Sequence, residues 1–430
     1  MDLSVSHRKR LGERAYLIGV QDAREPAWRA RDSLAELAEL AGTAGVEEVG
    51  RMLVRLRAPH PATWIGSGKV EELAAVIRSC GAEVVLFDED LSPVQGRNLE
   101  QAFGVRVVDR TQVILDIFAQ RAHTAEGRLQ IELAQLEYLL PRLRHLWTHL
   151  ERQKGGIGLK GPGEQQIELD RRRVETRIVS IRKQMDGVRA RRRELRRGRQ
   201  RHGWALICLV GYTNAGKTTL LNALTGAAAY ADDRLFATLD PTTRRLDLPN
   251  HQPALLTDTV GFIRKLPHRL VDAFRSTLEE ATTADLLLHV VDASHPAAAE
   301  QIEAVRGVLL ELGAKDPPMV TVLNKADSAG AQGPARRLAA EIPGSVVISA
   351  RTGDGLDDLR TVIADRLRDR SVPFSVWIPF ADGRSVAGLR QGARIESERE
   401  EGEGLRIRGR APRRLLGALG RGVIHEHIEN

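Results

Sequence analysis

Short apolar runs, each followed at once by glycine or polar residues, recur between residues 201 and 370. Four of them cover residues 205–210, 253–256, 319–323 and 345–348. Uninterrupted apolar runs of this length, bounded by turn signals, are typical of strands buried on both faces of a sheet. We therefore predict an α/β domain over 201–370, with polar segments directly after its strands.

A similar pattern of apolar runs and amphipathic stretches occupies the first 120 residues. It predicts strands over 15–21, 84–87 and 105–108, and helices over 30–41, 70–78 and 94–102. Strands that alternate with helices favour a parallel sheet, so we predict a small α/β domain over 1–120. Within it, residues 66–69 (Gly-Ser-Gly-Lys) resemble part of a phosphate loop. Residue 63 is not glycine and Val70 stands where Ser or Thr is needed, so we interpret the segment as the glycine turn that begins a helix.

A different period begins after residue 121. Apolar residues step by four and three positions at Leu129, Leu133, Leu136, Leu140, Leu143, Trp147 and Leu150, and again at Val174, Ile178, Ile181, Met185 and Val188. Two such heptad stripes joined by a glycine-rich turn predict an antiparallel helical hairpin over 121–200. A first arm of about 27 residues would be a rod of roughly 40 Å, and Pro141 should kink it. Two ordinary core helices are the alternative, but the basic outer faces argue against burial on several sides.

The turn between the two stripes, residues 154–164, carries five glycines and two lysines. A hydrophobic core needs no such loop, whereas a backbone that must approach a partner closely does. We predict a probe that contacts a partner, with a merely flexible turn as the alternative. Its candidate contact residues are Gly155, Gly156, Ile157, Gly158, Lys160, Gly161, Pro162 and Gly163.

The last part of the chain shows a third pattern. After Pro373, short alternating runs such as 375–378 and 405–408 are separated by glycines. This alternation predicts a small β-rich appendage over 371–430. The chain thus divides into four predicted parts, and its fold class is α/β.

Charge changes this picture in one segment. The chain has a formal net charge of +7, yet residues 151–200 alone hold 16 Lys or Arg against 7 Asp or Glu, a net of +9. The rest of the chain therefore sums to −2. A concentrated basic segment is expected where a protein binds a phosphate backbone. A solvated helix face is the alternative, which the unmatched clusters 171–173 and 191–193 disfavour.

Cysteine content and hydropathy indicate the class of protein. The two cysteines, Cys80 and Cys208, lie far apart in apolar surroundings, as expected for buried, reduced thiols of a cytoplasmic protein. No apolar run reaches 18 residues, so we expect no transmembrane helix. The basic start is not followed by an apolar stretch, so we expect no signal peptide.

Candidate chemistry appears directly after the run 205–210. There the chain reads Gly211-Tyr212-Thr213-Asn214-Ala215-Gly216-Lys217-Thr218, which fits G-x-x-x-x-G-K-[ST]. In this setting backbone N–H groups and a helix N-terminus surround a phosphate. Lys217 would reach the outer phosphates of a nucleotide, and Thr218 would ligate Mg²⁺.

Three further motifs follow the other apolar runs. They are Asp258-Thr259-Val260-Gly261, Asn324-Lys325-Ala326-Asp327 and Ser349-Ala350-Arg351. The first resembles the D-x-x-G turn, whose aspartate holds Mg²⁺ through water and whose glycine N–H meets the γ-phosphate. The second resembles N-K-x-D, in which a buried carboxylate at Asp327 would accept hydrogen bonds from two guanine donors that adenine lacks. The third resembles the S-A-x turn that closes over the base.

With these motifs in place, the chain resembles the HflX family of translational GTPases over nearly its full length. The most specific segments are 66–73, 91–95, 155–164 and Leu235-Phe236-Ala237-Thr238-Leu239-Asp240-Pro241-Thr242. The resemblance implies that the last segment is the first switch, and that Thr238 completes the Mg²⁺ site when GTP is bound. It also implies binding to the large (50S) ribosomal subunit and its rRNA, with the hairpin directed towards the peptidyl-transferase region. Splitting of stalled 70S ribosomes, notably after heat stress, is the activity that follows from the resemblance.

The motifs also indicate how hydrolysis would proceed. We expect Lys217, Thr238 and Gly261 to be catalytic and Thr218 and Thr238 to hold the metal. Phe262 follows the D-x-x-G motif, where many GTPases carry a glutamine that orients the attacking water. Phenylalanine cannot do so, so intrinsic hydrolysis should be slow until another group completes the site.

Two sources could supply that missing group. The first is a partner, expected to be the large subunit. The second is K⁺ held by Asn214, for which a loop-stabilising hydrogen bond is the alternative role.

We therefore expect a monomeric, cytoplasmic, GTP-dependent ribosome-splitting factor. A GTPase of large-subunit assembly would use the same chemistry on immature particles. An RNA-binding protein with nucleotide-regulated affinity is the alternative from another class. Membrane association through the basic helix is disfavoured, because the hairpin already needs the apolar stripe of that helix.

Overall fold

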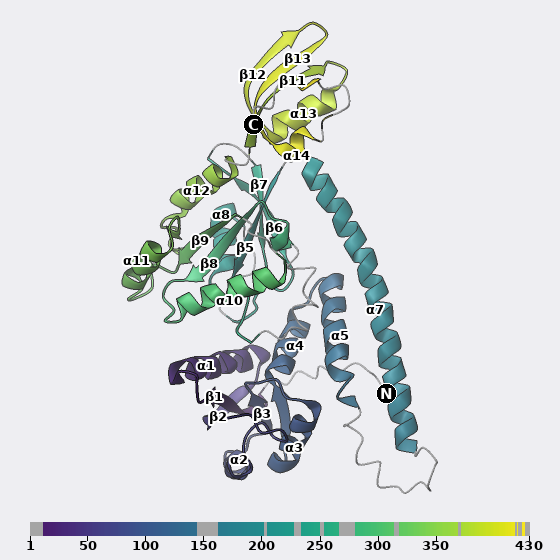
Figure 1. Cartoon of the computed structure of the whole chain (residues 1–430), viewed down its shortest axis with the longest axis vertical. Coiled ribbons are helices and arrows are strands. Elements are labelled where there is room, and N and C mark those ends of the chain that lie inside the picture. The colour runs from purple at the N-terminus through teal and green to yellow at the C-terminus, as the bar shows by residue number, and fades with distance from the viewer. Residues whose placement is uncertain are drawn as a thin grey trace. The chain divides into compact units, whose positions relative to one another are not determined.

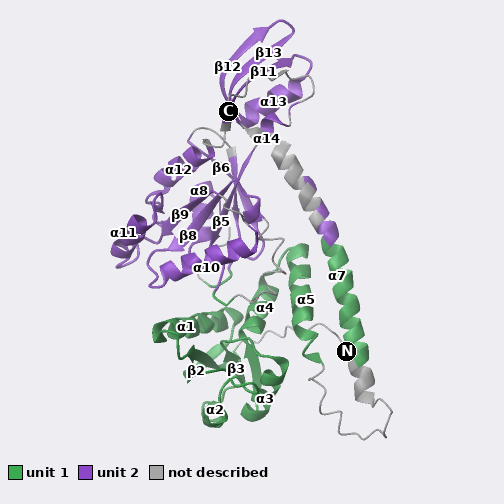
Figure 2. Ribbon diagram, viewed as in Figure 1, with its two compact units in different colours: residues 1–185, 233–236, 264–274 green, residues 186–232, 237–263, 275–430 purple. Residues whose placement is uncertain are grey.

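A computed structural model describes the chain at residues 12–143, 162–201, 204–227, 234–249, 253–265, 280–313, 318–368, 371–417, 419 and 424–425. These residues form two compact units (Figure 2). Unit 1 comprises residues 1–185, 233–236 and 264–274, and unit 2 comprises 186–232, 237–263 and 275–430. The four-part division expected from the sequence stays a prediction.

Unit 1 is built on a four-stranded parallel sheet of order β2-β1-β3-β4. Its strands are β1 (Arg14–Asp22), β2 (Glu47–Leu56), β3 (Val84–Phe87) and β4 (Arg106–Asp109). The helices are α1 (Ala27–Ala44), α2 (Ser67–Ser79), α3 (Pro93–Phe103) and α4 (Arg110–Arg121). The predicted parallel α/β arrangement is confirmed (Figure 1), and Gly66 caps the start of α2 as expected.

Strand β2 was not among the predicted strands. It lacks the unbroken buried run of β1, charged residues interrupt its apolar ones, and most of its side chains are only partly buried. Strand β2 lies at the edge of the sheet and pairs with β1 alone, so a weak apolar pattern is sufficient there.

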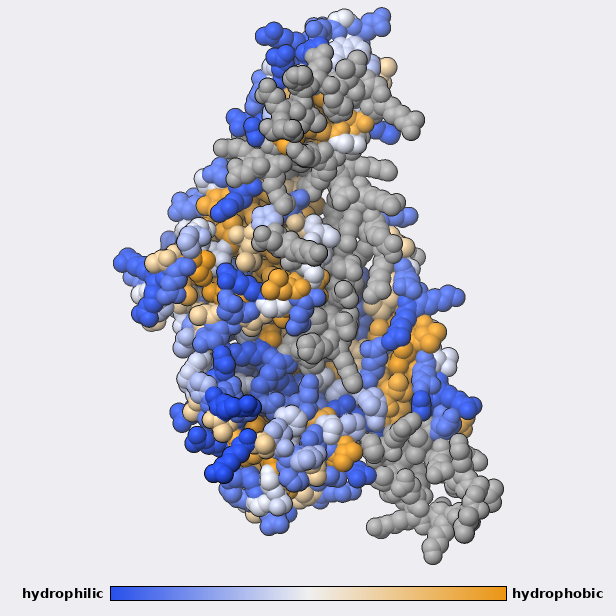
Figure 3. Space-filling view, viewed as in Figure 1, coloured by the Kyte–Doolittle hydropathy of each residue, from blue (hydrophilic) through white to orange (hydrophobic). Residues whose placement is uncertain are grey.

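The structure describes two helices of the predicted hairpin. They are α5 (Ala125–Leu139) in unit 1 and α7 (Pro162–Arg201), which belongs to unit 1 up to Met185. Leu133, Leu136 and Leu143 form one cluster with four residues of the second stripe, which are Val174, Ile178, Ile181 and Met185. Arg177 of α7 pairs with Glu132 of α5, and Arg182 with Glu137. An apolar band follows the line between α5 and α7 in Figure 3.

Two expectations about this hairpin are wrong in detail. Helix α5 ends at Leu139 and the chain turns at residues 140–142, so Pro141 lies after the helix instead of kinking it. Leu140 still has helical backbone angles, but Pro141 has no N–H with which to continue the helical hydrogen bonds, which explains the stop. Pro162 and Gly163, expected in the glycine-rich turn, form the first residues of α7, where proline is well tolerated. Trp147 and Leu150 of the first stripe, and residues 154–161 of the turn, lie outside the described residues.

Unit 2 contains a six-stranded sheet of order β10-β9-β8-β5-β7-β6. The strands are β5 (Ala205–Gly211), β6 (Thr242–Asp247), β7 (Pro253–Asp258), β8 (Leu286–Asp292), β9 (Met319–Asn324) and β10 (Val346–Val347). All neighbours are parallel except β6, which runs antiparallel to β7. The helices of this part are α8 (Lys217–Thr225), α10 (Ala298–Glu311), α11 (Gln332–Glu341) and α12 (Leu356–Arg368). The four apolar runs found in the sequence are thus β5, β7, β9 and β10.

The C-terminal part is β-rich, as predicted. Strands β11 (Ser371–Pro379), β12 (Arg394–Glu401), β13 (Gly404–Pro412) and β14 (Ile424–His425) form an antiparallel sheet of order β12-β13-β11-β14. Two helices accompany it, α13 (Gly383–Gly392) and α14 (Arg413–Leu416). Among the helices that the structure describes in either unit, none has the length and hydropathy needed to cross a bilayer.

Candidate nucleotide site

The G-x-x-x-x-G-K-T segment forms the turn between β5 and α8 in unit 2. Gly216 lies at φ 89° and is the residue before the helix. A Cβ atom at Gly216 would lie 2.3 Å from Nδ2 of Asn324, so only glycine fits. Tyr212, Thr213 and Ala215 have buried side chains. The loop therefore presents mainly its backbone, which suits a phosphate.

Lys217 begins α8 and is buried. Its Nζ donates to the carbonyl oxygens of Gly211 at 3.1 Å and Tyr212 at 2.8 Å. Burial lowers its pKa to about 8, although the nearby Asp258 carboxylate acts in the opposite direction. The phosphates of a nucleotide would stabilise the charged ammonium.

Three side-chain oxygens meet beside Lys217. Thr218 Oγ1 lies 2.7 Å from Asp258 Oδ2 and 2.8 Å from Thr238 Oγ1, and Thr238 Oγ1 lies 2.9 Å from the same carboxylate oxygen. The other carboxylate oxygen, Asp258 Oδ1, is buried without a hydrogen-bond partner in the described part of the chain. Burial raises the pKa of Asp258, against the effect of Lys217 and the two hydroxyl groups.

This oxygen set fits Mg²⁺. The ion prefers hard oxygen ligands, few of them from the protein and the rest from water and substrate phosphates. Two hydroxyls and one carboxylate with an unsatisfied buried oxygen match that preference. Across the described residues there is no group of three or more His, Cys, Asp or Glu that could hold a metal ion.

The D-x-x-G turn lies against the phosphate loop. A Cβ atom on Gly261 would lie 2.8 Å from Thr213 and 3.0 Å from Lys217 Nζ. The Phe262 N–H donates to the Gly211 carbonyl at 3.1 Å, and the Thr213 N–H donates to the Phe262 carbonyl at 2.7 Å. Phe262 is 2% exposed, so a buried phenyl group occupies the position directly after the D-x-x-G motif, where a water-orienting side chain would lie. Thr259 and Val260 are also buried.

Asn324 joins the two loops expected to bind the nucleotide. Its Nδ2 donates to the Ala215 carbonyl, and its Oδ1 accepts from the Ala350 N–H, both at 2.9 Å. Lys325 has a positive φ of 64°, and its Nζ lies 2.8 Å from Asp292 Oδ2. The N-K-x-D and S-A-x motifs are thereby fixed beside the phosphate loop.

Asp327 lies at the open end of the same sheet. Ser349 Oγ donates to its Oδ1 at 2.7 Å, and Arg351 pairs with its other oxygen. The hydrogen bond from Ser349 is the largest cause that lowers the pKa of Asp327. The side chain is 13% exposed, so the expected buried carboxylate is partly open to solvent, because it follows β9 in a loop.

The residues of segment 234–240 have two kinds of surroundings. Thr238 contributes to the oxygen cluster above, whereas Phe236 and Leu239 have buried side chains, and Ala237 and Asp240 are partly buried. The Phe236 ring packs edge-to-face on Phe118 in unit 1, with 4.6 Å between the ring centres. Any nucleotide contact by Phe236 would therefore use its backbone.

Unit 1 contains a buried charge cluster that no sequence motif indicates. Arg110, 1% exposed, pairs with Glu36 and donates to Asp88 Oδ1 at 2.7 Å. Lys265 lies 3.2 Å from Asp88 and 2.6 Å from Glu89, and Arg264 lies 2.6 Å from Asp32. These two basic residues follow Gly261 by three and four positions, which is the only sequence signal that could have drawn attention to them.

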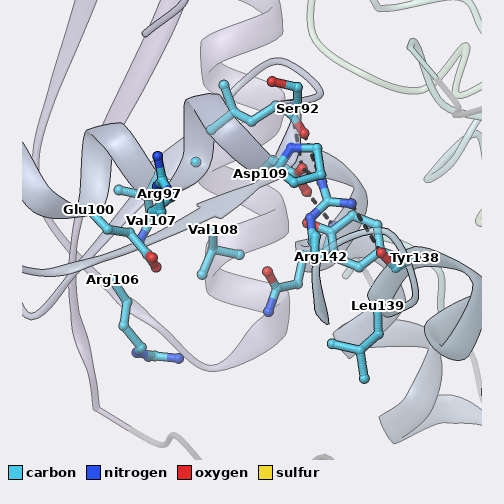
Figure 4. Close-up of a pocket in the computed structure, with 14 residues that line it drawn as sticks. Ser92, Arg97, Glu100, Arg106, Val107, Val108, Asp109, Tyr138, Leu139 and Arg142 are labelled. Atoms are coloured by element: carbon cyan, nitrogen blue, oxygen red, sulfur yellow. Dashed lines mark hydrogen bonds and ion pairs between the residues drawn. The ribbon is translucent and has the colours of Figure 1, made fainter. Parts of the chain in front are cut away.

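Unit 1 also contains a cavity of about 220 Å³ beside the start of α3 and the end of α5 (Figure 4). On one side Arg142 donates to Asp109 at 2.9 Å and covers the Tyr138 ring, 3.5 Å from its centre. Burial raises the pKa of Asp109. These polar groups satisfy one another, and none of the sequence motifs for nucleotide binding lines the cavity.

Comparisons with known proteins give the same picture along the chain. Three family models match: "GTP-binding GTPase N-terminal" at residues 31–119, "GTP-binding GTPase Middle Region" at 121–199 and "50S ribosome-binding GTPase" at 206–325. The chain is 46% identical over 394 residues to the GTPase HflX of Escherichia coli, covering 91% of this chain and 92% of that one. It is 44% identical over 411 residues to the GTPase HflX of Lacrimispora saccharolytica, covering 96% of each.

A solved structure of a complex of SsGBP with GDP is also similar. It covers 82% of this chain and 98% of its own, with 25% identity and a TM-score of 0.47.

Proposed function

The chain belongs to the HflX family of GTPases, and from that premise we propose that its GTP-bound form binds the large ribosomal subunit and splits stalled 70S ribosomes. The observation that carries the proposal is the oxygen cluster of Thr218, Thr238 and Asp258. It joins the phosphate loop to the segment before β6, through Thr238, and to the end of β7, through Asp258. A ligand bound at this point therefore controls both segments. A GTP-dependent switch is the function that such a junction supports best.

We infer separate tasks for the residues of the site. The loop amides and Lys217 bind the phosphates, and Lys217 exchanges its two backbone acceptors for phosphate oxygens. Thr218 and Thr238 would hold Mg²⁺, with Asp258 linked through water. The ion would neutralise charge that develops on the phosphates. Gly261 allows its N–H to face the last phosphate, because a side chain there would contact Thr213 and Lys217.

Hydrolysis by the isolated protein should be slow. A buried Phe262 cannot orient water, so a group from the ribosome completes the site. A K⁺ ion at Asn214 is the second candidate. Asn214 is exposed, with φ 58°, and no hydrogen bond to its side chain is present within the described residues. Equal turnover in Na⁺ and K⁺ buffers would remove the cation from consideration.

The experiment that tests the proposal is sedimentation of 70S ribosomes with the protein and a non-hydrolysable GTP analogue. We expect a nucleotide-dependent shift to free subunits, lost when residues 155–163 are replaced by a short linker. Splitting by the analogue would mean that binding energy separates the subunits and that hydrolysis serves release. Intact 70S with binding to free large subunits only would favour subunit assembly instead.

The variant Asp327→Asn tests whether splitting depends on recognition of the guanine base. An amide in place of the carboxylate offers a donor, which suits the second carbonyl group of xanthine in place of the guanine amine. We expect this variant to split ribosomes with an XTP analogue and to lose splitting with the GTP analogue. Binding to rRNA that ignores both nucleotides would support the RNA-binding alternative.

The same proposal includes the oligomeric state of the protein, its compartment and the conditions under which it acts. A ribosome-splitting factor acts as a monomer in the cytoplasm, where ribosomes stall after heat stress. Accumulation of precursor large subunits in cells without the protein would contradict it, because that outcome indicates an assembly factor.

A further inference from the structure

The two faces of the C-terminal sheet have opposite character. One face is apolar: Phe374, Val376 and Ile378 of β11 and Ile407 of β13 are buried in one cluster with Val386 and Leu389 of α13. Successive side chains of a strand alternate between faces. The intervening residues therefore lie on the other face, away from this core.

The strand register puts five arginines on that second face. Across β12, β13 and β11, one row holds Arg399, Arg406 and Trp377, and the next holds Ser397, Arg408 and Ser375. A third row, beyond the bulge in β12, holds Arg394, Arg410 and Pro373. We call Arg394, Arg399, Arg406, Arg408 and Arg410 the arginine face. Figure 3 shows hydrophilic residues gathered over the β12–β13 end of this part.

This arrangement brings positive charges together on one face of the sheet. Two of the three rows set one arginine directly opposite another, and like charges in that position destabilise a sheet. The face has few acids: Glu401 pairs with Arg406, and Glu396 is the extra residue of the bulge. Arg394, Arg399 and Arg408 are exposed, and their side chains have no hydrogen bond or ion pair to another described residue.

An aromatic ring lies on the same face. The Trp377 Nε1 donates to the Glu401 carbonyl at 2.9 Å. A Cβ atom on Gly404 would be 2.7 Å from two atoms of the ring, so the indole lies against the backbone beside Arg406. A ring fixed flat on a sheet and next to cationic side chains is the arrangement on which unpaired bases stack.

We propose that the arginine face binds RNA through its phosphate backbone, with Trp377 as a stacking surface for one base. Arginine forks match phosphate oxygens in pairs, and a row of them on a rigid sheet suits a chain of phosphates. This inference rests on the proposed function in that the RNA is rRNA of the large subunit. It adds a second RNA-binding surface, separate in sequence from the hairpin turn.

The test compares two full-length variants with the same charge change. One carries Arg394→Gln, Arg399→Gln and Arg408→Gln. The control carries Arg336→Gln, Arg337→Gln and Arg366→Gln, three exposed arginines on α11 and α12. Binding to protein-free large-subunit rRNA is measured by anisotropy over a series of salt concentrations.

We expect the first variant to bind rRNA at least tenfold more weakly at low salt. The slope of log affinity against log salt should fall in magnitude by about 2, since each lost phosphate contact removes about 0.7 to 0.9. The control variant should match the wild type. Trp377→Ala should weaken binding several-fold, and Trp377→Phe should restore it.

Folding and nucleotide binding give the necessary checks. Removal of facing arginines should leave thermal stability unchanged or raised, so weaker binding cannot be ascribed to unfolding. GDP affinity should be that of the wild type. The proposal is overturned if the two triple variants bind rRNA equally, or if vesicles of anionic lipid, and not rRNA, distinguish them.

The rRNA-binding assay and the splitting assay test the two proposals separately. A wild-type protein that leaves 70S intact, with rRNA binding lost in the first variant alone, contradicts the proposed function and keeps this inference. A first variant that splits ribosomes normally and binds rRNA normally contradicts this inference alone.

Discussion

At the scale of single residues, Gly216 decides whether two loops of the nucleotide site fit together. Its missing side chain leaves room for Asn324, which bonds both the phosphate loop and the loop after β10. One methyl group at this position would displace Asn324 and leave two buried hydrogen-bonding groups without partners.

Gly216→Ala should therefore weaken GDP binding by about 100-fold, or about 2.7 kcal/mol. The measurement is a titration with fluorescent GDP. Gly226→Ala is the matched control, because Gly226 also has a positive φ, 64°, but no atom lies within 4 Å of its added Cβ. The control should lose about 1 kcal/mol of stability from backbone strain and keep its GDP affinity. Equal GDP affinities of the two variants would contradict this account.

His289 of β8 is a residue that no motif predicted. It is 1% exposed, its Nδ1 has no partner within the described residues, and burial lowers its pKa to about 3. The folded protein therefore keeps it neutral down to about pH 3, whereas the unfolded chain takes up a proton near pH 6.5. The unfolded state binds more protons in that interval, so stability present above pH 6.5 is lost as the pH falls.

The consequence is measurable with His289→Leu. Between pH 7.5 and pH 5, this histidine should cost the wild type about 2 kcal/mol of unfolding free energy, which the variant should not lose. Calorimetric unfolding at the two pH values gives the comparison. The raised pKa of Asp258 acts with the opposite sign but is common to both proteins. Equal losses in the two proteins would mean that His289 is protonated in the folded state.

At the scale of elements, the seam between α5 and α7 is held by side chains at heptad spacing. Ile181→Ala removes a residue that is 0% exposed within this cluster, so unfolding free energy should fall by about 2–4 kcal/mol. Val179→Ala changes the same helix where the side chain is 67% exposed and should cost less than about 0.5 kcal/mol. Denaturant titration followed by circular dichroism distinguishes them. A similar cost for both would mean that the seam does not stabilise the helices.

The elements also show what sequence can and cannot predict. Strands such as β5 and β9 were predicted because they are buried on both faces and read as unbroken apolar runs. Strand β2 was not predicted, because a strand at the edge of a sheet needs only a weak pattern of apolar residues. The end of α5 was misplaced because the heptad spacing continues to Leu143 through a turn that contains Pro141, and Leu143 still packs in the cluster.

For the candidate site, the motifs predicted which residue types gather, since each motif follows a parallel strand and such ends meet at one edge. They could not predict Asn324 as the link between loops, or the Arg110 cluster. Those contacts depend on distances between segments far apart in sequence, which no local pattern encodes.

At the scale of the whole molecule, charge is distributed unevenly, with +9 in residues 151–200 and −2 in the remainder. Under the proposed function, such a field should speed association with the large ribosomal subunit at low salt. Substitution of Arg191, Arg192 and Arg193 by glutamine should lower the association rate several-fold at about 50 mM salt. At about 300 mM salt the rates should converge, with little change in dissociation. Stopped-flow binding to large subunits tests this, and an unchanged rate at low salt would refute it.

The edge of the C-terminal sheet affects the tendency of the protein to aggregate. Strand β12 is the outermost strand of its sheet, and its free backbone groups could pair with a strand of another molecule. Charged side chains occupy most of its length, and a bulge interrupts its register. A second chain would have to bring its own strand against these charges, so the sheet resists growth into aggregates. This edge thereby avoids nucleating the fibrous deposits that exposed, apolar strand edges promote.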